Sequence, residues 1–277
     1  MAVPQTRELI ERALAEDIGV GDVTTDALVP ADARARAIIE QKARGVIAGL
    51  DVARAVFEAV DGELRWEPRV TEGEWREGGP VAEIWGSAAS ILKGERVALN
   101  FLGRLSGIAT LTARFVRAVE GTGTQILDTR KTTPGLRELE KRAVATGGGT
   151  NHRSGLHDAI LVKENHIEAA GGVGEATRRA LAAARDRMQV EVECASLEEV
   201  EETVNAGASM ILLDNMTPDE LRRAVELTAG RAKLEASGGV TLENVGEIAE
   251  TGVDYISVGA LTHSAPALDL SLRMERL

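Results

Sequence analysis

The sequence predicts a two-part α/β protein, in which a small N-terminal α+β sandwich domain precedes an open, incomplete βα barrel of about seven strands. Before residue 120, strand and helix patterns follow one another without regular alternation, which is typical of a small α+β domain. From Gln125 onward, short apolar runs alternate with helix patterns, as in repeated βα units. The late runs end at Glu193, Asp214, Ser237 and Gly259, spaced 21, 23 and 22 residues apart, so each interval holds one βα unit.

The first part of the chain carries the patterns of the expected N-terminal domain. Residues 5–17 predict an amphipathic helix, with Leu9, Ile10, Ala13 and Leu14 on one face. An irregular link is expected to begin at residues 22–25. The later patterns predict strands at 33–42, 64–70 and 81–86, and helices at 49–60 and 93–119. We place this domain at residues 1–111.

The second part is expected to form the barrel domain, at residues 112–265. Its apolar runs predict strands at 125–127, 159–162, 189–192, 209–213, 232–236 and 254–258, and helix patterns lie at 173–186, 196–206, 217–229 and 241–251. About 150 residues are too few for eight such units, so six or seven strands and an unclosed barrel are expected. The tail, 266–277, is expected to form a strand that returns to the first domain. By alternation along its strand, Glu191 is expected to point outward into the helix layer.

Charge and composition exclude several classes of function. A net charge of −12 argues against general binding to nucleic acid, and no run approaches the roughly 18 apolar residues of a membrane span. The N-terminal segment lacks the apolar core of a signal peptide. Cys194 is the only cysteine, which predicts no intrachain disulfide and a reducing compartment, the cytoplasm, with Cys194 as a packing residue. The four histidines lack ligand spacing, so no zinc site is expected.

A basic island lies inside this acidic chain. The stretch from Thr129 to Lys163 has a local charge of +4. Like charges at this density repel unless something neutralises them, so an anionic ligand is expected. The basic residues of the island are Arg130, Lys131, Arg137, Lys141, Arg142, Arg153 and Lys163, and its acids are Glu138, Glu140 and Asp158.

Several of these cations occupy positions that suit substrate binding. Arg130 and Lys131 lie between a strand end and a Pro-Gly turn, where two cations can hold a carboxylate or a phosphate. Arg153 follows a glycine-rich loop. Lys163 ends an apolar strand and is expected in the mouth of the barrel, either as an anion ligand or as a Schiff-base lysine. The alternatives are a solvated basic loop, a plain connection and a surface lysine.

Acidic residues and glycines follow the later strands. Glu193 and Asp214 end neighbouring strands, where two carboxylates suit Mg²⁺ shared with a ligand phosphate. A general acid and base, or an ion pair with Lys163 or Lys131, would place carboxylates there equally well. The loops that begin at Ser237 and Ser257 carry glycines before a helix or turn, which favours a phosphate cradle over simple turn chemistry.

Eight short motifs in order make the sequence resemble the quinolinate phosphoribosyltransferase family over nearly its whole length. In the family, the position of Glu164 is more often Asp. The motifs are Arg104-Leu-Ser-Gly-Ile-Ala-Thr, Asp128-Thr-Arg-Lys-Thr-Thr-Pro-Gly-Leu-Arg, Gly147-Gly-Gly-Thr-Asn-His-Arg, Lys163-Glu-Asn-His, Val192-Glu-Cys, Leu213-Asp-Asn-Met, Glu235-Ala-Ser-Gly-Gly and Ser257-Val-Gly-Ala-Leu-Thr-His-Ser.

The resemblance implies an activity: quinolinate and phosphoribosyl pyrophosphate (PRPP) give nicotinate mononucleotide, pyrophosphate and CO₂, with Mg²⁺ and no organic cofactor, in NAD biosynthesis. It implies a sandwich domain before an open seven-stranded barrel, and a homodimer in which Arg104 reaches the partner's site. Assembly beyond the dimer stays open.

The resemblance also implies the role of each matching residue. Lys131, Glu193 and Asp214 are the catalytic set, with Glu193 and Asp214 near the ribose hydroxyls and Mg²⁺. The quinolinate carboxylates are held by Arg104, Thr129, Arg130, Lys131, His152, Arg153 and Lys163. The PRPP site comprises Lys131, Lys163, Glu193, Asp214, Ser237, Gly238, Gly239, Val258, Gly259 and Ala260.

Three other functions stay open from the sequence. A sister enzyme of the same fold could accept another pyridine or anionic acceptor, because substrate choice depends on pocket shape. A lyase could form a Schiff base on Lys163. A non-catalytic anion-binding protein is the third, although the pair Glu193 and Asp214 argues against it.

Overall fold

The computed structural model describes residues 4–184 and 188–277, which group into two compact units. The first unit comprises the chain up to Ala113, together with Pro134–Gly148 and Ala265–Leu277. The second comprises Arg114–Thr133 and Gly149–Ser264. Residues 1–3 of the expected N-terminal domain, and residues 185–186 of the helix predicted at 173–186, lie outside the described part of the chain.

The first unit is built on a four-stranded antiparallel sheet with the order β12-β1-β5-β3. Its strands are β1 (Arg34–Gln41), β3 (Arg65–Pro68), β5 (Gly79–Ser87) and β12 (Leu270–Arg276). In β1, Ala35, Ala37 and Ile39 are fully buried and alternate with more exposed residues. The face of the sheet to which they point therefore belongs to the core. Because β12 pairs with β1, the end of the chain completes the sheet that its beginning started.

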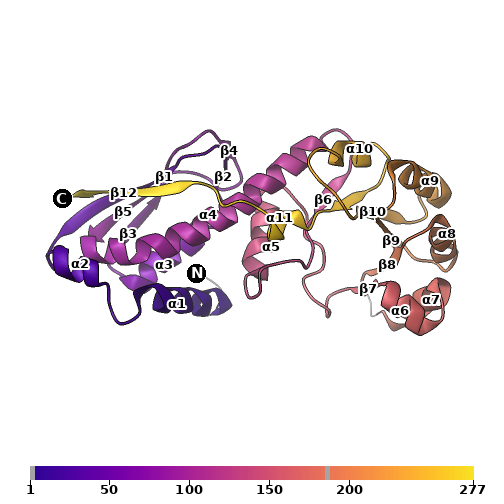
Figure 1. Cartoon of the computed structure of the whole chain (residues 1–277), viewed down its shortest axis with the longest axis horizontal. Helices are drawn as coiled ribbons and strands as arrows, with labels where there is room; N and C mark the ends of the chain where they lie inside the picture. The colour runs from indigo at the N-terminus through magenta and orange to yellow at the C-terminus, as the bar shows by residue number, and fades with distance from the viewer. Residues whose placement is uncertain (1–3, 185–187) are drawn as a thin grey trace. The chain divides into compact units, whose positions relative to one another are not determined.

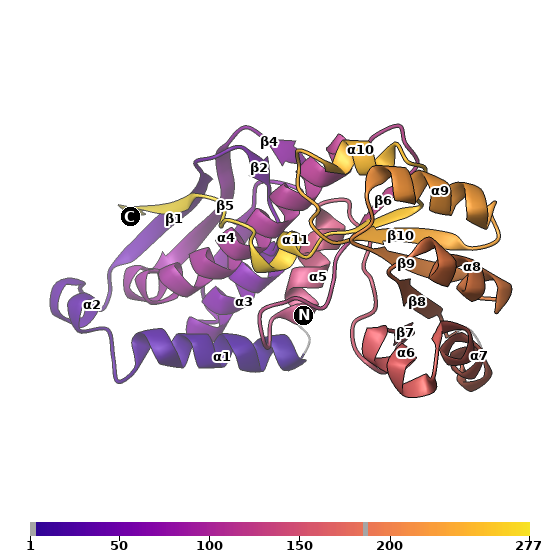
Figure 2. The same cartoon turned by 45° about the vertical axis from the view of Figure 1, so that its right-hand side comes forward.

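The helices of the first unit are α1 (Pro4–Ile18), α2 (Val23–Leu28), α3 (Leu50–Val60), α4 (Ala88–Ala118) and α5 (Arg137–Thr146). A short ribbon pairs β2 (Gly45–Val46) with β4 (Trp75–Arg76). Figure 2 shows α1 packed beside α3, whose Val52, Val56 and Phe57 are buried. The expectation of an irregular link at 22–25 was wrong, because the Asp22 carboxylate caps α2 by accepting a hydrogen bond from the Thr25 amide.

Helix α5 belongs to the first unit, which differs from the expected division at residues 111 and 112. Its Arg142 forms an ion pair of 2.7 Å with Asp51 of α3. At its end, Gly147 approaches α4 so closely that a Cβ there would overlap the Ala109 carbonyl oxygen. The chain therefore leaves the second unit after Thr133 and re-enters it at Gly149.

The second unit contains a parallel sheet of six strands in the order β6-β11-β10-β9-β8-β7. The strands are β6 (Gln125–Leu127), β7 (Ile160–Val162), β8 (Val190–Cys194), β9 (Met210–Asp214), β10 (Lys233–Ser237) and β11 (Tyr255–Ser257), one for each predicted apolar run. The sheet is open because β6 and β7 are its two edges. A single bridge between Leu127 and Thr150 continues it beyond β6, so the described residues give six strands and one rung in place of about seven strands.

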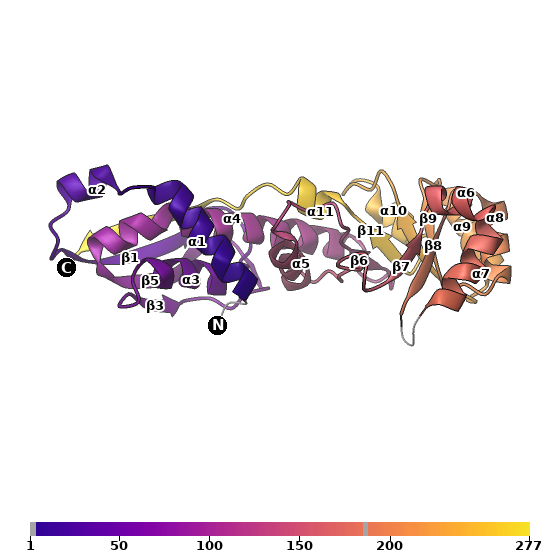
Figure 3. The same ribbon diagram turned by 90° about the horizontal axis from the view of Figure 1, so that it is seen from below.

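Helices connect these strands and lie along the outer face of the sheet. They are α6 (Glu164–Ala170), α7 (Val173–Ala183), α8 (Leu197–Asn205), α9 (Pro218–Thr228), α10 (Val245–Ala249) and α11 (Ala260–His263). Figures 1 and 3 show α7, α8 and α9 beside strands β8 and β9. Ser196 and Thr217 cap α8 and α9 by accepting hydrogen bonds from backbone amides. In the part of the chain that the structure describes, no helix meets the length and apolarity of a membrane span.

The predicted packing role of Cys194 fits its position in β8. The residue is fully buried, and its Sγ lies 3.3 Å from the Thr203 hydroxyl. Burial raises the pKa of the thiol to about 12, so the reactive thiolate is disfavoured.

A tight contact between α4 and the returning tail yields a stability prediction. A Cβ at Gly107 would overlap the Pro266 carbonyl oxygen, and backbone cannot move aside as a flexible side chain can. We therefore expect Gly107→Ala to lower the free energy of unfolding by about 2 kcal/mol, measured by urea denaturation. Gly62→Ala is the matched control, since nothing lies within 4 Å of its added methyl group. Equal stability of the two variants would contradict the tight contact.

Candidate active site

A cavity of about 680 Å³ opens at the carboxyl ends of the parallel strands. All of its lining residues belong to the second unit. They are Thr129, Arg130, Lys131, His152, Arg153, Leu161, Lys163, Glu193, Leu212, Asp214, Asn215, Glu235, Ser237, Gly238, Gly239 and Ser257. The loops that follow parallel strands meet at this edge of the sheet, so side chains far apart in the sequence share one hollow.

Two half-buried arginines bring positive charge to the cavity, and the charges of Glu191 and Asp158 offset part of it at Arg153. Arg130 Nε is buried without a hydrogen-bond partner, and among the described residues no carboxylate lies within 4 Å of either guanidinium. Burial lowers the pKa of Arg153, and the nearby charge of Arg130 lowers it further. Arg153 donates a long hydrogen bond of 3.3 Å to the Ala159 carbonyl oxygen. Two guanidiniums in this state are suited to a ligand that brings its own negative charge.

Acidic residues lie on the neighbouring strands. Lys163, at the end of β7, forms an ion pair of 2.7 Å with Glu193 of β8. Asp214 ends β9, and its Oδ2 accepts a hydrogen bond of 2.8 Å from the Asn215 side chain. The ion pair with Lys163, one alternative for Glu193, is therefore present. Asp214 keeps carboxylate oxygen exposed toward the cavity, so the donor set of oxygen atoms fits a hard divalent cation.

The glycine-rich turn after β10 brings backbone to the cavity surface. Gly238 and Gly239 have φ angles of 99° and 61°, a region that favours glycine. A Cβ at Gly238 would overlap the Asn215 side chain, so a larger residue would displace the segment beside Asp214. Freed backbone amides at such a turn can bind phosphate oxygens.

The second glycine segment, at residues 258–260, lies behind the cavity wall. Ser257 lines the cavity, whereas Val258 is buried and Gly259 begins the short helix α11. A Cβ at Gly259 would lie 3.0 Å from Lys131 Cδ. The Thr262 hydroxyl donates a hydrogen bond of 2.8 Å to the Lys131 carbonyl oxygen, which fixes the loop that carries Lys131.

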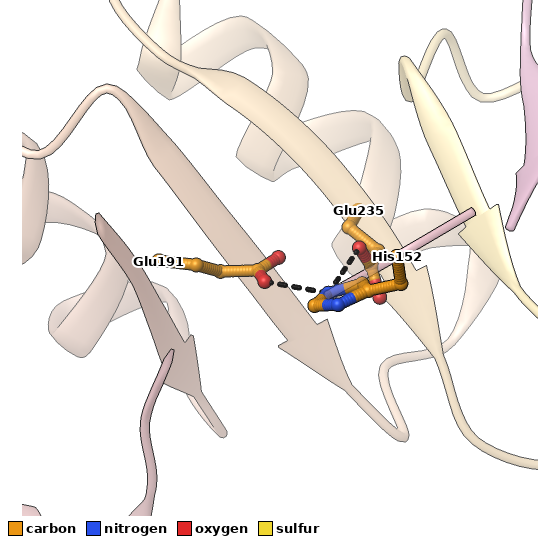
Figure 4. Close-up of side chains that lie close together, drawn as sticks. All are labelled: His152, Glu191 and Glu235. Atoms are coloured by element: carbon orange, nitrogen blue, oxygen red, sulfur yellow. Dashed lines mark hydrogen bonds and ion pairs between the residues drawn. The ribbon is translucent and has the colours of Figure 1, made fainter. Parts of the chain in front are cut away.

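A cluster of one histidine and two buried glutamates lies between this cavity, which His152 and Glu235 line, and a second cavity of about 440 Å³, which His152 and Glu191 line. Figure 4 shows the three side chains pointing toward one another. His152 Nε2 lies 2.8 Å from Glu191 Oε2 and 3.4 Å from Glu235 Oε2. Glu191 and Glu235 are 2% and 1% exposed. The expectation that Glu191 points outward was wrong, because residues 191 and 193 are two apart and so share one face of β8.

The cluster retains a proton at neutral pH. Burial disfavours charge on His152, but the hydrogen bonds to Glu191 and Glu235 outweigh it and raise the pKa of His152 to about 10. An imidazolium would carry protons on both ring nitrogens, whereas Nδ1 accepts a hydrogen bond of 2.7 Å from the Arg153 amide. These two observations disagree, and we favour the contact, because two N–H groups cannot face each other at that distance. The ring proton then lies on Nε2, and the second proton belongs to the carboxylates.

A raised carboxyl pKa agrees with this proton count. Burial raises the pKa of Glu191 to about 7, although the hydrogen bond from His152 opposes it. His152 and Glu191 influence each other's protonation through this hydrogen bond. The hydrogen bond from the Arg153 amide to His152 Nδ1 argues against a metal ion in this cluster, since a histidine that binds metal through Nε2 needs its proton on Nδ1.

The comparisons with known proteins identify the family of this chain. Residues 108–273 match the model of the quinolinate phosphoribosyl transferase C-terminal domain, and residues 22–106 match that of the N-terminal domain. The chain belongs to the quinolinate phosphoribosyltransferase family. Its sequence is 44% identical over 269 residues to the Bacillus subtilis protein named probable nicotinate-nucleotide pyrophosphorylase (carboxylating), covering 97% of this chain and 93% of that protein.

Further relatives of the family are similar over nearly the same length. Quinolinate phosphoribosyltransferase (decarboxylating) 2b, mitochondrial, of Nicotiana tabacum is 44% identical over 289 residues, which cover 97% of this chain and 82% of the plant protein. The crystal structure of NadC from Streptococcus pyogenes superposes with a TM-score of 0.95 and 41% identity, covering 100% of this chain and 99% of that one. The fold of a small α/β domain before an open parallel sheet is therefore that of the family.

Most residues that the family resemblance singled out are brought together in one cavity, and a few are not. Arg104 lies on α4 in the first unit, where it pairs with buried Glu140 at 2.8 Å and donates to the Ala265 carbonyl oxygen at 3.0 Å. The cavity is lined by the predicted residues Thr129, Arg130, Lys131, His152, Arg153, Lys163, Glu193, Asp214, Ser237, Gly238 and Gly239. Val258, Gly259 and Ala260 are not among its lining residues.

Sequence reasoning gave no role to Glu191 and Glu235. Residues 191 and 193 are two apart on one strand and therefore point to the same face, so the sequence already contained the information that places Glu191 beside Glu193. Glu235 ends an apolar run two residues before Ser237, and the same parity places it on the cavity side of β10. A carboxylate inside an apolar strand is unusual enough to mark a buried polar contact.

The cluster makes stability depend on pH between weakly acidic and neutral values. Because burial raises the pKa of Glu191 from 4.5 to about 7, the folded state binds more protons than the unfolded state between these values. This contribution to stability is complete below pH 4.5 and is lost as pH rises through 7, so the free energy of unfolding should fall over that window. Urea denaturation at several pH values measures it, and Glu191→Gln should flatten the slope. His157→Asn, at an exposed histidine, is the control, and equal slopes in all three proteins would contradict the shared proton.

Proposed function

We propose that this chain transfers the phosphoribosyl group of PRPP to quinolinate with decarboxylation, giving nicotinate mononucleotide, pyrophosphate and CO₂. As a member of its family the chain is an enzyme, a decarboxylating pentosyltransferase. The observation that carries the proposal is the pair Arg130 and Arg153. Their guanidiniums share one cavity with each other and have no carboxylate partner there, which suits a ligand with two adjacent carboxylates.

Quinolinate has a pyridine ring with carboxylates on neighbouring carbons, and the basic side of the cavity offers a cation for each. We assign its binding to Arg130, Arg153 and Lys163, with Lys131 close to both substrates and Thr129 at the rim. Lys163 would exchange part of its contact with Glu193 for a substrate carboxylate. His152 contributes through its position, because both of its ring nitrogens already have partners within the protein.

The acidic side of the cavity suits the sugar and the pyrophosphate. We assign Glu193 and Asp214 to the ribose hydroxyls and to Mg²⁺, which would neutralise the pyrophosphate when bound. The turn at Ser237, Gly238 and Gly239 offers backbone amides to the 5′-phosphate. The segment 258–260 would support that end through Ser257 and Lys131. No organic cofactor is required, since the substrate ring itself accepts electrons.

The reaction then follows from charge. Departure of pyrophosphate leaves positive charge on C1′ of the ribose, and Lys131 stabilises the negative charge of the leaving group. The carboxylates of Glu193 and Asp214 favour the cationic sugar. The pyridine nitrogen attacks C1′ and becomes quaternary. When the neighbouring carboxylate leaves as CO₂, its bonding electron pair stays on ring C2, where the positive nitrogen stabilises it until a proton from water replaces the carboxylate.

We extend the proposal to assembly and location. The active form is a homodimer in which Arg104 of one subunit binds the substrate carboxylate of the other, and further assembly of dimers is compatible with it. The cytoplasm, a reducing compartment, is supported by the single cysteine, which is buried and free.

The function predicts a defined product balance. Purified protein with quinolinate, PRPP and Mg²⁺ should form pyridine nucleotide, pyrophosphate and CO₂ in equal amounts, followed by absorbance and by released CO₂. Removal of Mg²⁺ with a chelator should stop the reaction, and added Mg²⁺ should restore it. Release of CO₂ without PRPP would contradict the order of steps. Borohydride trapping of a carbonyl substrate on Lys163 would favour the lyase instead.

Loss of one guanidinium should mainly weaken the binding of quinolinate. Arg153→Ala and Arg130→Ala are each expected to raise KM for quinolinate by about 10- to 100-fold, the value of one lost charge-assisted contact, while KM for PRPP changes by less than about twofold. Steady-state kinetics in both substrates measure the effect. Arg65→Ala, at an exposed arginine of the first unit, is the matched control. Normal quinolinate affinity in both cavity variants would contradict the assignment of Arg130 and Arg153 as the carboxylate clamp, the pair of arginines that binds the quinolinate carboxylates.

A mixing experiment tests the shared arginine. At a quinolinate concentration well below the KM of the variants, Arg104→Ala and Arg153→Ala are each expected to retain about one tenth of wild-type activity or less alone. A mixture that exchanges subunits would contain hybrid dimers with one intact site. Activity should then recover to about one quarter of the wild-type value, because half of the dimers are hybrids with one good site each. A mixture that stays inactive after proven subunit exchange would place Arg104 outside the partner's site.

A further inference from the structure

Glu191 and Glu235 are buried carboxylates that the proposed reaction does not use. They lie on β8 and β10, which are separated by β9, yet both approach the same atom, His152 Nε2. Glu191 Oε1 and both oxygens of Glu235 are buried without a hydrogen-bond partner among the described residues. Burying two carboxylates side by side is unfavourable, so the ring N–H between them is the interaction that holds this arrangement.

The ring in turn fixes a short stretch of backbone. Thr150 forms a single bridge to β6, and the His152 amide donates a hydrogen bond of 2.9 Å to the fully buried Asp128. His152 Nδ1 accepts the Arg153 amide at 2.7 Å. The segment 150–153 is therefore tied to β6 through its backbone and to β8 and β10 through one side chain.

Arg153 depends on this anchor. Among the described residues its guanidinium has no ion pair, and its hydrogen bond to Ala159 is long, at 3.3 Å. The backbone on one side of it is held by the His152 contacts. On the other side, the Ser154 amide donates to Asp158 at 2.6 Å. The direction of the Arg153 side chain into the cavity thus follows from where His152 is held.

We propose that Glu191 and Glu235 are positioning residues for the carboxylate clamp, acting through His152 on Arg153. Glu191 accepts the ring N–H, and Glu235 lies 3.4 Å from the same nitrogen, so together they hold the ring and keep the adjoining Arg153 in the cavity lining. The inference rests on the proposed function, because quinolinate is the ligand that reports the position of Arg153. It adds two residues to which the proposed reaction assigns no substrate contact, and it predicts an effect on one substrate only.

Paired substitutions at these glutamates test the inference. Glu191→Gln keeps an oxygen that can accept the ring N–H, whereas Glu191→Leu removes it. Glu235→Gln and Glu235→Leu make the same comparison for the carboxyl group that lies 3.4 Å from the ring nitrogen. Quinolinate binding by isothermal titration calorimetry should weaken by about tenfold or more in the leucine variants and by less than about threefold in the glutamine variants. KM for PRPP should stay within about twofold of the wild-type value in all four, since Arg153 lies on the quinolinate side.

A matched control and a second variant make the outcome decisive. Glu83→Leu removes an equally buried glutamate that pairs with Arg36 and Arg69 in the first unit, and it should leave quinolinate binding unchanged. If a leucine variant fails to fold, His152→Phe keeps a ring without its N–H and should show the same tenfold loss.

Three results would overturn the inference. These are normal quinolinate affinity in the leucine variants or His152→Phe, an equal loss for both substrates, and a glutamine variant as weak as its leucine counterpart. Failure of the wild-type protein itself to bind quinolinate would instead overturn the proposed function, so the two failures are distinguishable.

Discussion

The site depends on two guanidiniums that the protein leaves without acidic partners. Arg130 and Arg153 repel each other, and their burial removes the water that would screen them. A fold can hold such a pair only where the backbone on each side is fixed. Asp128, buried after β6, accepts the His152 amide, and Lys131 is tied through its carbonyl group to Thr262. The rest of the second unit can be understood as support for this one unfavourable contact, which a dianionic ligand would relieve.

The distribution of charge explains how an acidic chain can bind two anionic substrates. The chain has a net charge of −12, yet the loops at the carboxyl ends of the parallel strands carry the basic residues. Glu193 and Asp214 line the same cavity, where Glu193 pairs with Lys163 at 2.7 Å, and they suit a metal ion shared with phosphate. Basic residues gathered in one cavity with carboxylates beside them suit two anionic substrates, which the overall charge does not reveal.

Much of this arrangement was predictable, because strand period and turn chemistry are local properties. The six apolar runs became β6 to β11, and the residues that follow or end four of them, Lys163, Glu193, Asp214 and Ser237, line one cavity. Glu191 was placed on the wrong face because its parity with Glu193 was overlooked. The membership of α5 in the first unit depends on contacts such as Arg142 with Asp51, and the Asp22 cap of α2 concerns a helix of six residues. Long-range contacts and very short elements leave little pattern in a sequence.

The pairing of β12 with β1 has a consequence for synthesis of the chain on the ribosome. Residues 270–276 supply an edge strand to a sheet whose other strands all lie before residue 88. Every strand of the second unit is translated in between. The first sheet therefore remains incomplete, with the edge of β1 unpaired, while the strands of the parallel sheet are being synthesised. The parallel sheet has no such dependence and can assemble as soon as β11 emerges.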